Sequence, residues 1–258
     1  MEKTVFAADA FAGKVALISG GTSGIGFAAA ELLFAGGASV ALMGRDEARG
    51  QRALASLSAG ERACFVRGDV SASEDCRNAV AACVHAFGGV DILVNSAGIY
   101  AEGALDDLTE HDLDGLIATN IMGPFLLSQA ALPLLRQSGG NIVNVASDAG
   151  LHGNYFCAAY AATKGAVIAF TRSLALELAR DHVRVNAVAP ADVLTPLTER
   201  QISSQRTREE QLREMAALYP LGRIGMPREA AAVIAFLASP AAAWVTGSVY
   251  CVDGGLTA

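Results

Sequence analysis

Residues 14–45 read KVALISGGTSGIGFAAAELLFAGGASVALMGR and contain two short apolar runs separated by a helical pattern. The first run, 14–19, leads through glycines into a helix predicted over 25–35, which the glycine pair at 36–37 ends. The second run covers 38–43. Two buried strands joined by a helix are typical of the parallel β-α-β unit, so this stretch predicts an α/β protein.

The alternation of apolar runs and helical patterns continues through the rest of the chain. Further strands are expected at 64–66, 90–94, 141–145, 183–188 and 248–252, and further helices at 46–57, 73–87, 159–179, 228–238 and in a long pattern that ends at 135. Continuous apolar strands indicate a parallel sheet that is covered on both faces. Because no linker or repeat interrupts the pattern, we predict a single domain over 1–258, with a doubly wound parallel sheet and helices on both faces.

The composition excludes several classes of partner. Of the 258 residues, 52% are hydrophobic and 17% are charged, and the net charge is −7. A protein that binds nucleic acid would carry a basic face, and an anionic membrane surface would not attract this chain. Five scattered cysteines without a CxxC pair indicate reduced thiols, and the first residues lack the apolar core of a signal peptide, so we expect a cytoplasmic protein.

Two segments differ from this alternation. Residues 115–135 carry no charge but contain Asn120 and prolines, so we interpret them as a buried helix at a subunit contact rather than a membrane span. Residues 192–219 are polar and follow a predicted strand. This position predicts a helical lid over a site at the strand ends, although an ordinary solvated helix explains the composition equally well.

The glycine-rich turn at 20–26 predicts a nucleotide site. Its spacing is G-x-x-x-G-x-G, and it lies between the first strand and the first helix. Glycines let the backbone approach a pyrophosphate, and the helix N-terminus offers free N–H groups. Many such turns are only structural, but this location is typical of a Rossmann-type fold. The predicted contacts are Gly20, Thr22, Ser23, Gly24, Ile25 and Gly26.

The end of the second predicted strand favours NADP(H) over NAD(H). A carboxylate there would bind the free ribose hydroxyls, whereas an arginine suits a 2′-phosphate. Here Gly44 stands where the acid is expected, and Arg45 follows it. The alternative is that Arg45 is an exposed loop residue without a role in cofactor binding, and that Asp46 offsets its charge.

Tyr160 and Lys164 are spaced to share one face of a helix. A cation near a phenol stabilises the phenolate and lowers its pKa, which would make Tyr160 an acid/base near neutral pH. The same spacing also arises by chance in surface pairs. Ser147 ends a predicted strand, at the sheet edge where α/β proteins have their sites, and Asn120 is a buried amide that needs a partner.

With these residues the chain resembles the classical short-chain dehydrogenase/reductase (SDR) family over essentially its full length. The glycine turn matches, as do an N-x-A-G motif at 95–98 and the segment 190–195, which in the family grips the nicotinamide. Ser96 and Ala191 depart from the family pattern, and Ala191 could tighten the turn beside the nicotinamide. The resemblance adds the following cofactor contacts: Asp69 and Val70 near the adenine, Asn95, Ala97, Gly98, Tyr160, Lys164, Pro190, Val193 and Thr195.

The resemblance also implies a catalytic tetrad of Asn120, Ser147, Tyr160 and Lys164. Tyr160 would protonate the carbonyl oxygen as hydride arrives from the nicotinamide, while Ser147 hydrogen-bonds that oxygen. Lys164 would lower the pKa of Tyr160 and bind the nicotinamide ribose. Asn120 would hold a water that links Lys164 to solvent.

In this family the segment between Ser147 and Tyr160 usually lines the substrate pocket. The pocket residues that we expect are His152, Asn154, Tyr155 and Leu197. The remaining histidines lack metal-ligand spacing, so we predict no metal site. The family further implies a homotetramer built on the helices at 115–135 and 159–179.

The leading hypothesis is an NADP(H)-dependent oxidoreductase that interconverts a secondary alcohol and a ketone on a small or medium, fairly apolar substrate. A ketoreductase for acyl-carrier thioesters is an alternative with the same fold, but an acidic carrier would want a basic patch, which this acidic chain supports only weakly. A non-catalytic dinucleotide-binding sensor is an alternative of another class, and it has no need of Tyr160 and Lys164 together. The substrate, its stereochemistry and the direction of reaction do not follow from the sequence.

Overall fold

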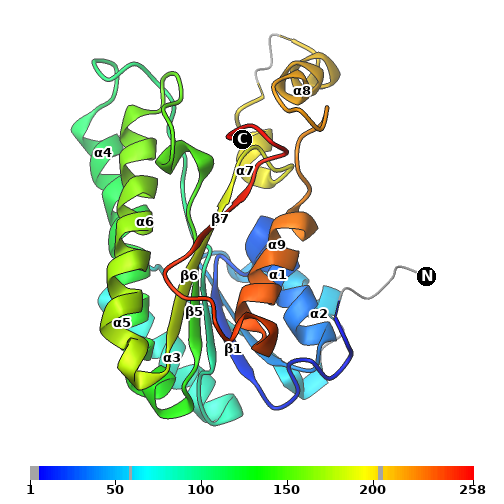
Figure 1. Cartoon of the computed structure of the whole chain (residues 1–258), viewed down its shortest axis with the longest axis vertical. Helices are drawn as coiled ribbons and strands as arrows, with labels where there is room; N and C mark the ends of the chain where they lie inside the picture. The colour runs from blue at the N-terminus through cyan, green and yellow to red at the C-terminus, as the bar shows by residue number, and fades with distance from the viewer. Residues whose placement is uncertain (1–5, 58–59, 203–205) are drawn as a thin grey trace.

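The computed structural model describes residues 6–57, 60–202 and 206–258. In this part of the chain seven parallel strands form one sheet, in the order β3-β2-β1-β4-β5-β6-β7 (Figure 1). The strands are β1 (Val15–Ser19), β2 (Ser39–Gly44), β3 (Ala63–Arg67), β4 (Ile92–Asn95), β5 (Asn141–Val145), β6 (Arg184–Pro190) and β7 (Val249–Val252). The strand order reverses between β1 and β4, at the kind of switch point where α/β proteins bind ligands.

Helices cover both faces of the sheet, which confirms the predicted doubly wound architecture (Figure 1). One face packs against α1 (Gly24–Ala35), α2 (Glu47–Leu57) and α9 (Pro227–Ala238). The other packs against α3 (Ser73–Phe87), α5 (Gly123–Ser138) and α6 (Ala158–Leu178).

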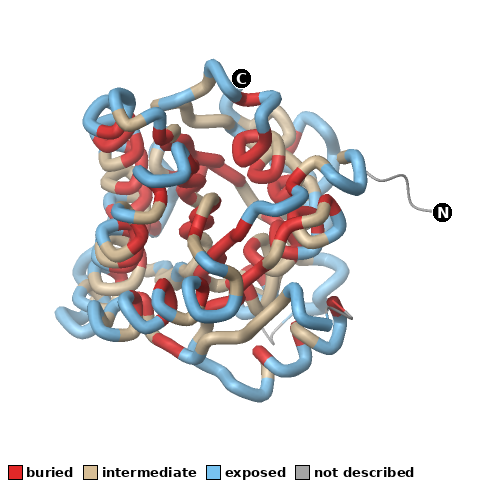
Figure 2. Tube along the Cα trace, turned by 90° about the horizontal axis from the view of Figure 1, so that it is seen from below, coloured by how far each residue is buried: buried red, intermediate tan, exposed pale blue. Residues whose placement is uncertain are grey.

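The first strand shows why the apolar runs form a sheet that is buried on both sides. All five residues of β1 are buried. Side chains alternate along a strand, so Ala16 and Ile18 join the core beneath α1 and α9, while Val15 and Leu17 join the core beneath α3, α5 and α6. Figure 2 shows these buried residues gathered in the interior, with exposed residues on the outer faces of the helices.

The long uncharged segment forms a helix with an irregular turn that the sequence did not predict. Helix α4 (Glu110–Leu116) runs into a π-helical turn, η2 (Ile117–Met122), and then into α5. The combined helix is long and apolar enough to cross a membrane by composition alone. Its inward residues Leu127, Ala131 and Leu135 are nevertheless fully buried against the sheet, as in the core helix of a globular domain. The π turn places Asn120 on the buried side.

The described part of the polar segment after β6 is helical, as expected, and lies above the carboxyl edge of the sheet (Figure 1). Its helices are α7 (Pro196–Glu199) and α8 (Arg208–Ala217), and none of the α8 residues is buried. A capping box begins α8: the Thr207 side chain accepts from the Glu210 N–H, and the Glu210 carboxylate accepts from the Thr207 N–H. Residues 203–205 of the expected lid lie outside the described residues.

Candidate active site

The predicted site residues gather at the carboxyl edge of the sheet, around one cavity of about 810 Å³. Its wall runs from the glycine turn after β1, past the ends of β4 and β5, to the loop after β6 and helix α8. The predicted residues that line it are Gly20, Ser23, Gly24, Ile25, Ala97, Gly98, Ser147, His152, Asn154, Tyr155, Tyr160, Lys164, Pro190, Val193, Thr195 and Leu197. All four residues expected in the substrate pocket are therefore in the wall.

The glycine turn is packed too closely for side chains. Gly20 has a φ of +64°, and a Cβ there would lie 2.9 Å from the Ala97 backbone. A Cβ on Gly26 would lie 2.5 Å from the Gly20 carbonyl oxygen. The N-cap residue of α1, Ser23, makes no side-chain capping hydrogen bond, which leaves the first N–H groups of the helix available to a ligand. The turn therefore fits the pyrophosphate of a dinucleotide.

Three arginines and one acid, Glu102, lie beside the place expected for the adenosine ribose. A Cβ on Gly44 would lie 3.1 Å from the Thr22 side chain, so a carboxylate has little room at the end of β2. Arg45 lines a second cavity together with Ser23, and two further arginines that the sequence reasoning missed, Arg49 and Arg200, line it as well. This arrangement would hold a phosphate on the ribose.

Asp69, expected at the adenine, lies next to this arginine group. Its carboxylate is 3.5 Å from Arg45 and accepts hydrogen bonds from the N–H and the hydroxyl of Ser71. Burial acts to raise the pKa of Asp69, but these hydrogen bonds and the Arg45 charge hold it below its usual value. Asp69 is therefore ionised at neutral pH and available as a hydrogen-bond acceptor.

Asn95 supports the site without lining the cavity. Its amide donates to Ser128 on α5 at 3.1 Å and to Asn144 on β5 at 2.8 Å. Asn144 in turn donates to Thr171 on α6 at 2.9 Å. This buried network ties the central strands to α5 and to α6, the helix that carries Tyr160 and Lys164. Val70 is likewise buried, beneath Gly123 at the start of α5.

Tyr160 and Lys164 lie one turn apart in the first half of α6, and both are buried. The Lys164 ammonium is 5.7 Å from the centre of the Tyr160 ring and donates to the Val145 carbonyl at 2.9 Å. Burial lowers the pKa of Lys164 to about 8. Burial also raises the pKa of Tyr160 above its usual value, with the charges of Asp148 and Asp192 adding to it. In the protein alone, the direction is opposite to the one that the Tyr–Lys spacing predicts.

Asn120 lies behind the cavity wall in the π turn η2. Its side-chain oxygen accepts from the Ile99 N–H at 2.9 Å, and its amide donates to the Ile99 carbonyl at 2.9 Å and to Thr163 at 3.1 Å. A Cβ on Gly98 would lie 3.4 Å from the Asn120 oxygen and 3.6 Å from the Lys164 nitrogen. The two polar groups therefore face the same point beside Gly98.

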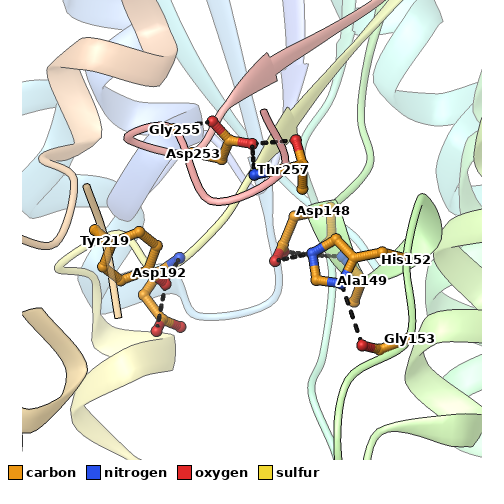
Figure 3. Close-up of polar contacts among 10 residues, drawn as sticks. Asp148, Ala149, His152, Gly153, Asp192, Tyr219, Asp253, Gly255 and Thr257 are labelled. Atoms are coloured by element: carbon orange, nitrogen blue, oxygen red, sulfur yellow. Dashed lines mark hydrogen bonds and ion pairs between the residues drawn. The ribbon is translucent and has the colours of Figure 1, made fainter. Parts of the chain in front are cut away.

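Ser147 is held by a neighbour that the sequence reasoning missed. It ends the strand-like run after β5 and begins the 3-10 turn η3 (Asp148–Gly150). Its hydroxyl donates to the buried Asp148 carboxylate at 2.8 Å and accepts from the Ala149 N–H at 3.2 Å. The other Asp148 oxygen lies 3.2 Å from His152 Nε2 (Figure 3), in an electrostatic contact outside hydrogen-bond geometry.

A second carboxylate comes from the loop after β6. The Tyr219 hydroxyl donates to Asp192 at 2.7 Å and accepts from the Asp192 N–H at 3.1 Å (Figure 3). The preceding Ala191 N–H donates to the Val252 carbonyl at 3.3 Å, and Ala191 has no positive φ. The alanine that departs from the family pattern therefore fits this turn without backbone strain.

Comparison with known proteins identifies the family. Residues 20–257 match the family model described as Enoyl-(Acyl carrier protein) reductase. A relative from Xanthobacter autotrophicus, 2-(S)-hydroxypropyl-CoM dehydrogenase 3, is 40% identical over 95% of this chain and 97% of its own. A crystal structure of a short-chain dehydrogenase/reductase of glucose/ribitol dehydrogenase type from Brucella melitensis is 38% identical, covers 98% of this chain and 100% of its own, and superposes with a TM-score of 0.91. This chain is a short-chain dehydrogenase/reductase.

The predicted family membership and fold of this SDR are thereby confirmed, and it is an oxidoreductase that acts on CH–OH or C=O groups. A second solved structure, the 3-ketoacyl-(acyl-carrier-protein) reductase of Brucella melitensis complexed with NADH, is 34% identical. The match covers 96% of this chain and 100% of the reductase chain, with a TM-score of 0.88. A nicotinamide dinucleotide is accordingly the cofactor that the glycine turn and the cavity fit.

Proposed function

We propose that this SDR uses NADP(H) to interconvert a secondary alcohol and a ketone, with Tyr160 as the acid/base. The observation that carries the proposal is that Ser147, Tyr160 and Lys164 share one cavity with the glycine turn. The nicotinamide, when bound, supplies or accepts the hydride. A cavity that joins this turn to a buried phenol brings the two ends of the reaction together.

Each side chain contributes a defined step. Because burial raises the pKa of Tyr160, the phenol is protonated at neutral pH and can donate to a carbonyl oxygen during reduction. The Ser147 hydroxyl can turn from Asp148 to that same oxygen and stabilise the charge that develops there. Lys164 and Asn120 face one point beside Gly98, which suits the return of a proton to Tyr160 from solvent.

The preference for NADP(H) rests on the three arginines beside Ser23. Replacing Arg45 by alanine should raise the KM for NADPH by about tenfold or more, because a charge-assisted phosphate contact is lost. The KM for NADH should change by less than about twofold, since NADH has no phosphate there. An equal effect on both cofactors would contradict the assignment.

The reaction type is tested by following nicotinamide absorbance with a panel of ketones, diketones, sugars and thioester ketones. Tyr160→Phe is the control, and cofactor binding is measured separately by fluorescence. We expect turnover in the unmodified protein and none in the variant, with cofactor binding retained in both. Cofactor binding without turnover in either protein would favour the sensor alternative.

Thioester reduction remains the second candidate, because one relative of known structure is a 3-ketoacyl-(acyl-carrier-protein) reductase. The charges around the cavity argue against it. Glu102, Asp148 and Asp192 line the wall, and an acidic carrier would be repelled there.

Three further features belong to the proposal. The 192–219 segment acts as a lid, since Leu197, Met215 and Leu218 line the cavity. Four chains assemble through α5 and α6, where Phe125 is 43% exposed and stacks on Phe170. The enzyme works in the cytoplasm, where its reduced thiols are stable.

A further inference from the structure

Three carboxylates from separate loops line the same cavity as Tyr160. Glu102 follows β4, Asp148 follows β5 and Asp192 follows β6, so all three lie near the carboxyl edge of the sheet. Figure 3 shows Asp192 with Tyr219 on one side of the C-terminal turn, and Asp148 with His152 on the other. The substrate end of the cavity is therefore acidic.

Little positive charge balances Asp148 and Asp192, whereas Glu102 also lines the second cavity with the three arginines of the ribose end. Among residues 6–57, 60–202 and 206–258, neither Glu102 nor Asp192 takes part in an ion pair. Each instead accepts a phenol hydrogen bond, at 3.0 Å from Tyr100 to Glu102 and at 2.7 Å from Tyr219 to Asp192. Only Asp148 has a partner that can be charged, His152 at 3.2 Å.

The other cations of the wall are engaged elsewhere. Lys164 donates to the Val145 carbonyl, and Arg206 forms an ion pair with Glu214 that neutralises both. Burial raises the pKa of Asp192, and the charges of Asp148 and Glu102 raise it further. The acids therefore act on one another through the cavity, and a bound cation would relieve this repulsion.

We propose that the substrate carries a protonated amine beside its ketone or alcohol, and that Asp192 and Glu102 bind this amine. The inference rests on the proposed function, since it concerns the same cavity. A hydroxyl-rich substrate would also donate to carboxylates, but the two tyrosines already supply hydroxyl donors. What Asp192 and Glu102 lack is an ion-pair partner, and Tyr100 and Tyr219 line the cavity beside them.

The amine takes no part in the chemistry. In reduction of an amino ketone, the carbonyl carbon receives hydride from the reduced nicotinamide, and the oxygen receives a proton from Tyr160. The products are an amino alcohol and the oxidised cofactor, and the ammonium group is unchanged. Its role is to hold the substrate with the carbonyl against Tyr160 and Ser147.

A matched series of ketones tests the charge directly. The amine 1-(dimethylamino)propan-2-one and its neutral isostere 4-methylpentan-2-one differ in shape by little more than the exchange of N–H for C–H. Erythrulose supplies hydroxyls, and 4-oxopentanoate supplies a negative charge. With NADPH, we expect kcat/KM for the amine to exceed that for the isostere by about tenfold or more, which is about 1.4 kcal/mol. The anion should be the poorest substrate.

Substitutions that remove one carboxylate at a time then show which residue binds the amine. Asp192→Asn should lower kcat/KM for the amine about tenfold more than kcat/KM for the isostere. Glu102→Gln should act in the same sense but more weakly, because Glu102 is exposed to solvent. Glu61→Gln, in the exposed turn before β3 at the opposite edge of the sheet, is the matched control and should change neither.

Calorimetry of the NADPH-bound enzyme separates this inference from the proposed function. 1-Aminopropan-2-ol should bind more tightly than propane-1,2-diol, whether or not any ketone is turned over. Selective amine binding without turnover would support the amine site and contradict the proposed reaction. Turnover of the neutral ketones with no preference for the amine, or a preference for erythrulose, would overturn the inference and leave the proposed function standing. An equal loss for all ketones in Asp192→Asn would also overturn it.

Discussion

Gly150 lies where the turn after Ser147 meets the backbone of α6. Its packing therefore couples the position of Ser147 to the helix that carries Tyr160 and Lys164. A Cβ on Gly150 would lie 2.7 Å from the Lys164 carbonyl carbon and 2.8 Å from the Gly165 nitrogen. The first distance is about 0.8 Å short of an optimal carbon–carbon contact. Because both neighbours are backbone atoms of a helix, the turn and the helix must move apart to admit a methyl group.

The substitution Gly150→Ala should therefore cost both stability and activity. Overpacking of this kind costs about 1–3 kcal/mol. For a domain of this size, about 2 kcal/mol corresponds to a fall in Tm of roughly 4–8 °C. A displacement of the order of 1 Å between Ser147 and Tyr160 should lower kcat by roughly 10- to 100-fold.

Gly153→Ala is the matched control. It lies three residues further along the same loop, and a Cβ there meets no atom within 4 Å. Both variants would be compared by thermal unfolding, by kcat with NADPH and a ketone, and by NADPH affinity. The affinity should stay within about threefold, because the glycine turn is untouched. A Gly150→Ala protein as active as Gly153→Ala would refute the coupling between the turn and the helix.

Three further predictions follow from the charges and surfaces of the site. Lys164→Met should abolish turnover and change the pH dependence of stability. Burial lowers the pKa of Lys164 from 10.5 to about 8, so between these pH values the folded protein binds fewer protons than the unfolded chain. The Tm of the unmodified protein, relative to that of the variant, should therefore rise from pH 7 to pH 10. A constant difference would contradict this. Burial is the main cause of the raised pKa of Tyr160, and the Asp148 charge adds to it. Asp148→Asn should therefore shift the pH profile of the alcohol-oxidation rate to lower pH by up to about one unit. A shift to higher pH would contradict this role of Asp148. Phe125→Glu should reduce the mass measured by light scattering from four chains to fewer, whereas an unchanged mass would exclude this face from the assembly.

The fold could be predicted because its central strands are buried on both faces. Runs such as β1 and β2 are continuously apolar, and the glycine turn marks the passage from strand to helix. The apolar pattern that predicted the long helix could not predict the π turn around Asn120. An apolar helix pattern does not distinguish a regular turn from one with an extra residue, and only the backbone of the folded chain shows the π turn.

Most of the predicted site residues lie around one cavity, but part of the electrostatics of that cavity did not follow from the sequence. Tyr160 and Lys164 could be paired from their spacing alone. The raised pKa of Tyr160 depends on burial and on Asp148 and Asp192, which the Tyr–Lys spacing does not encode. A signal did exist, since Asp148 and Asp192 are charged residues just beyond the carboxyl ends of strands, where sites in parallel sheets lie.

The arginine group beside Ser23 was only partly predictable. Arg45 follows directly from the end of β2, and Arg49 is four residues further on. Arg200 comes from the end of α7, far away in the sequence, and only the folded chain brings it to the same cavity.

The most direct measurement follows a labelled hydride. NADPH carrying deuterium at the transferred position of the nicotinamide would be incubated with the ketone that gives the highest turnover, and the alcohol product would be analysed by mass spectrometry. We predict a product one mass unit heavier, labelled at the former carbonyl carbon, and no product from Tyr160→Phe although that variant still binds NADPH. Unlabelled product, or a Tyr160→Phe protein that transfers deuterium at the unmodified rate, would contradict the assignment of Tyr160 as the acid/base of a hydride transfer.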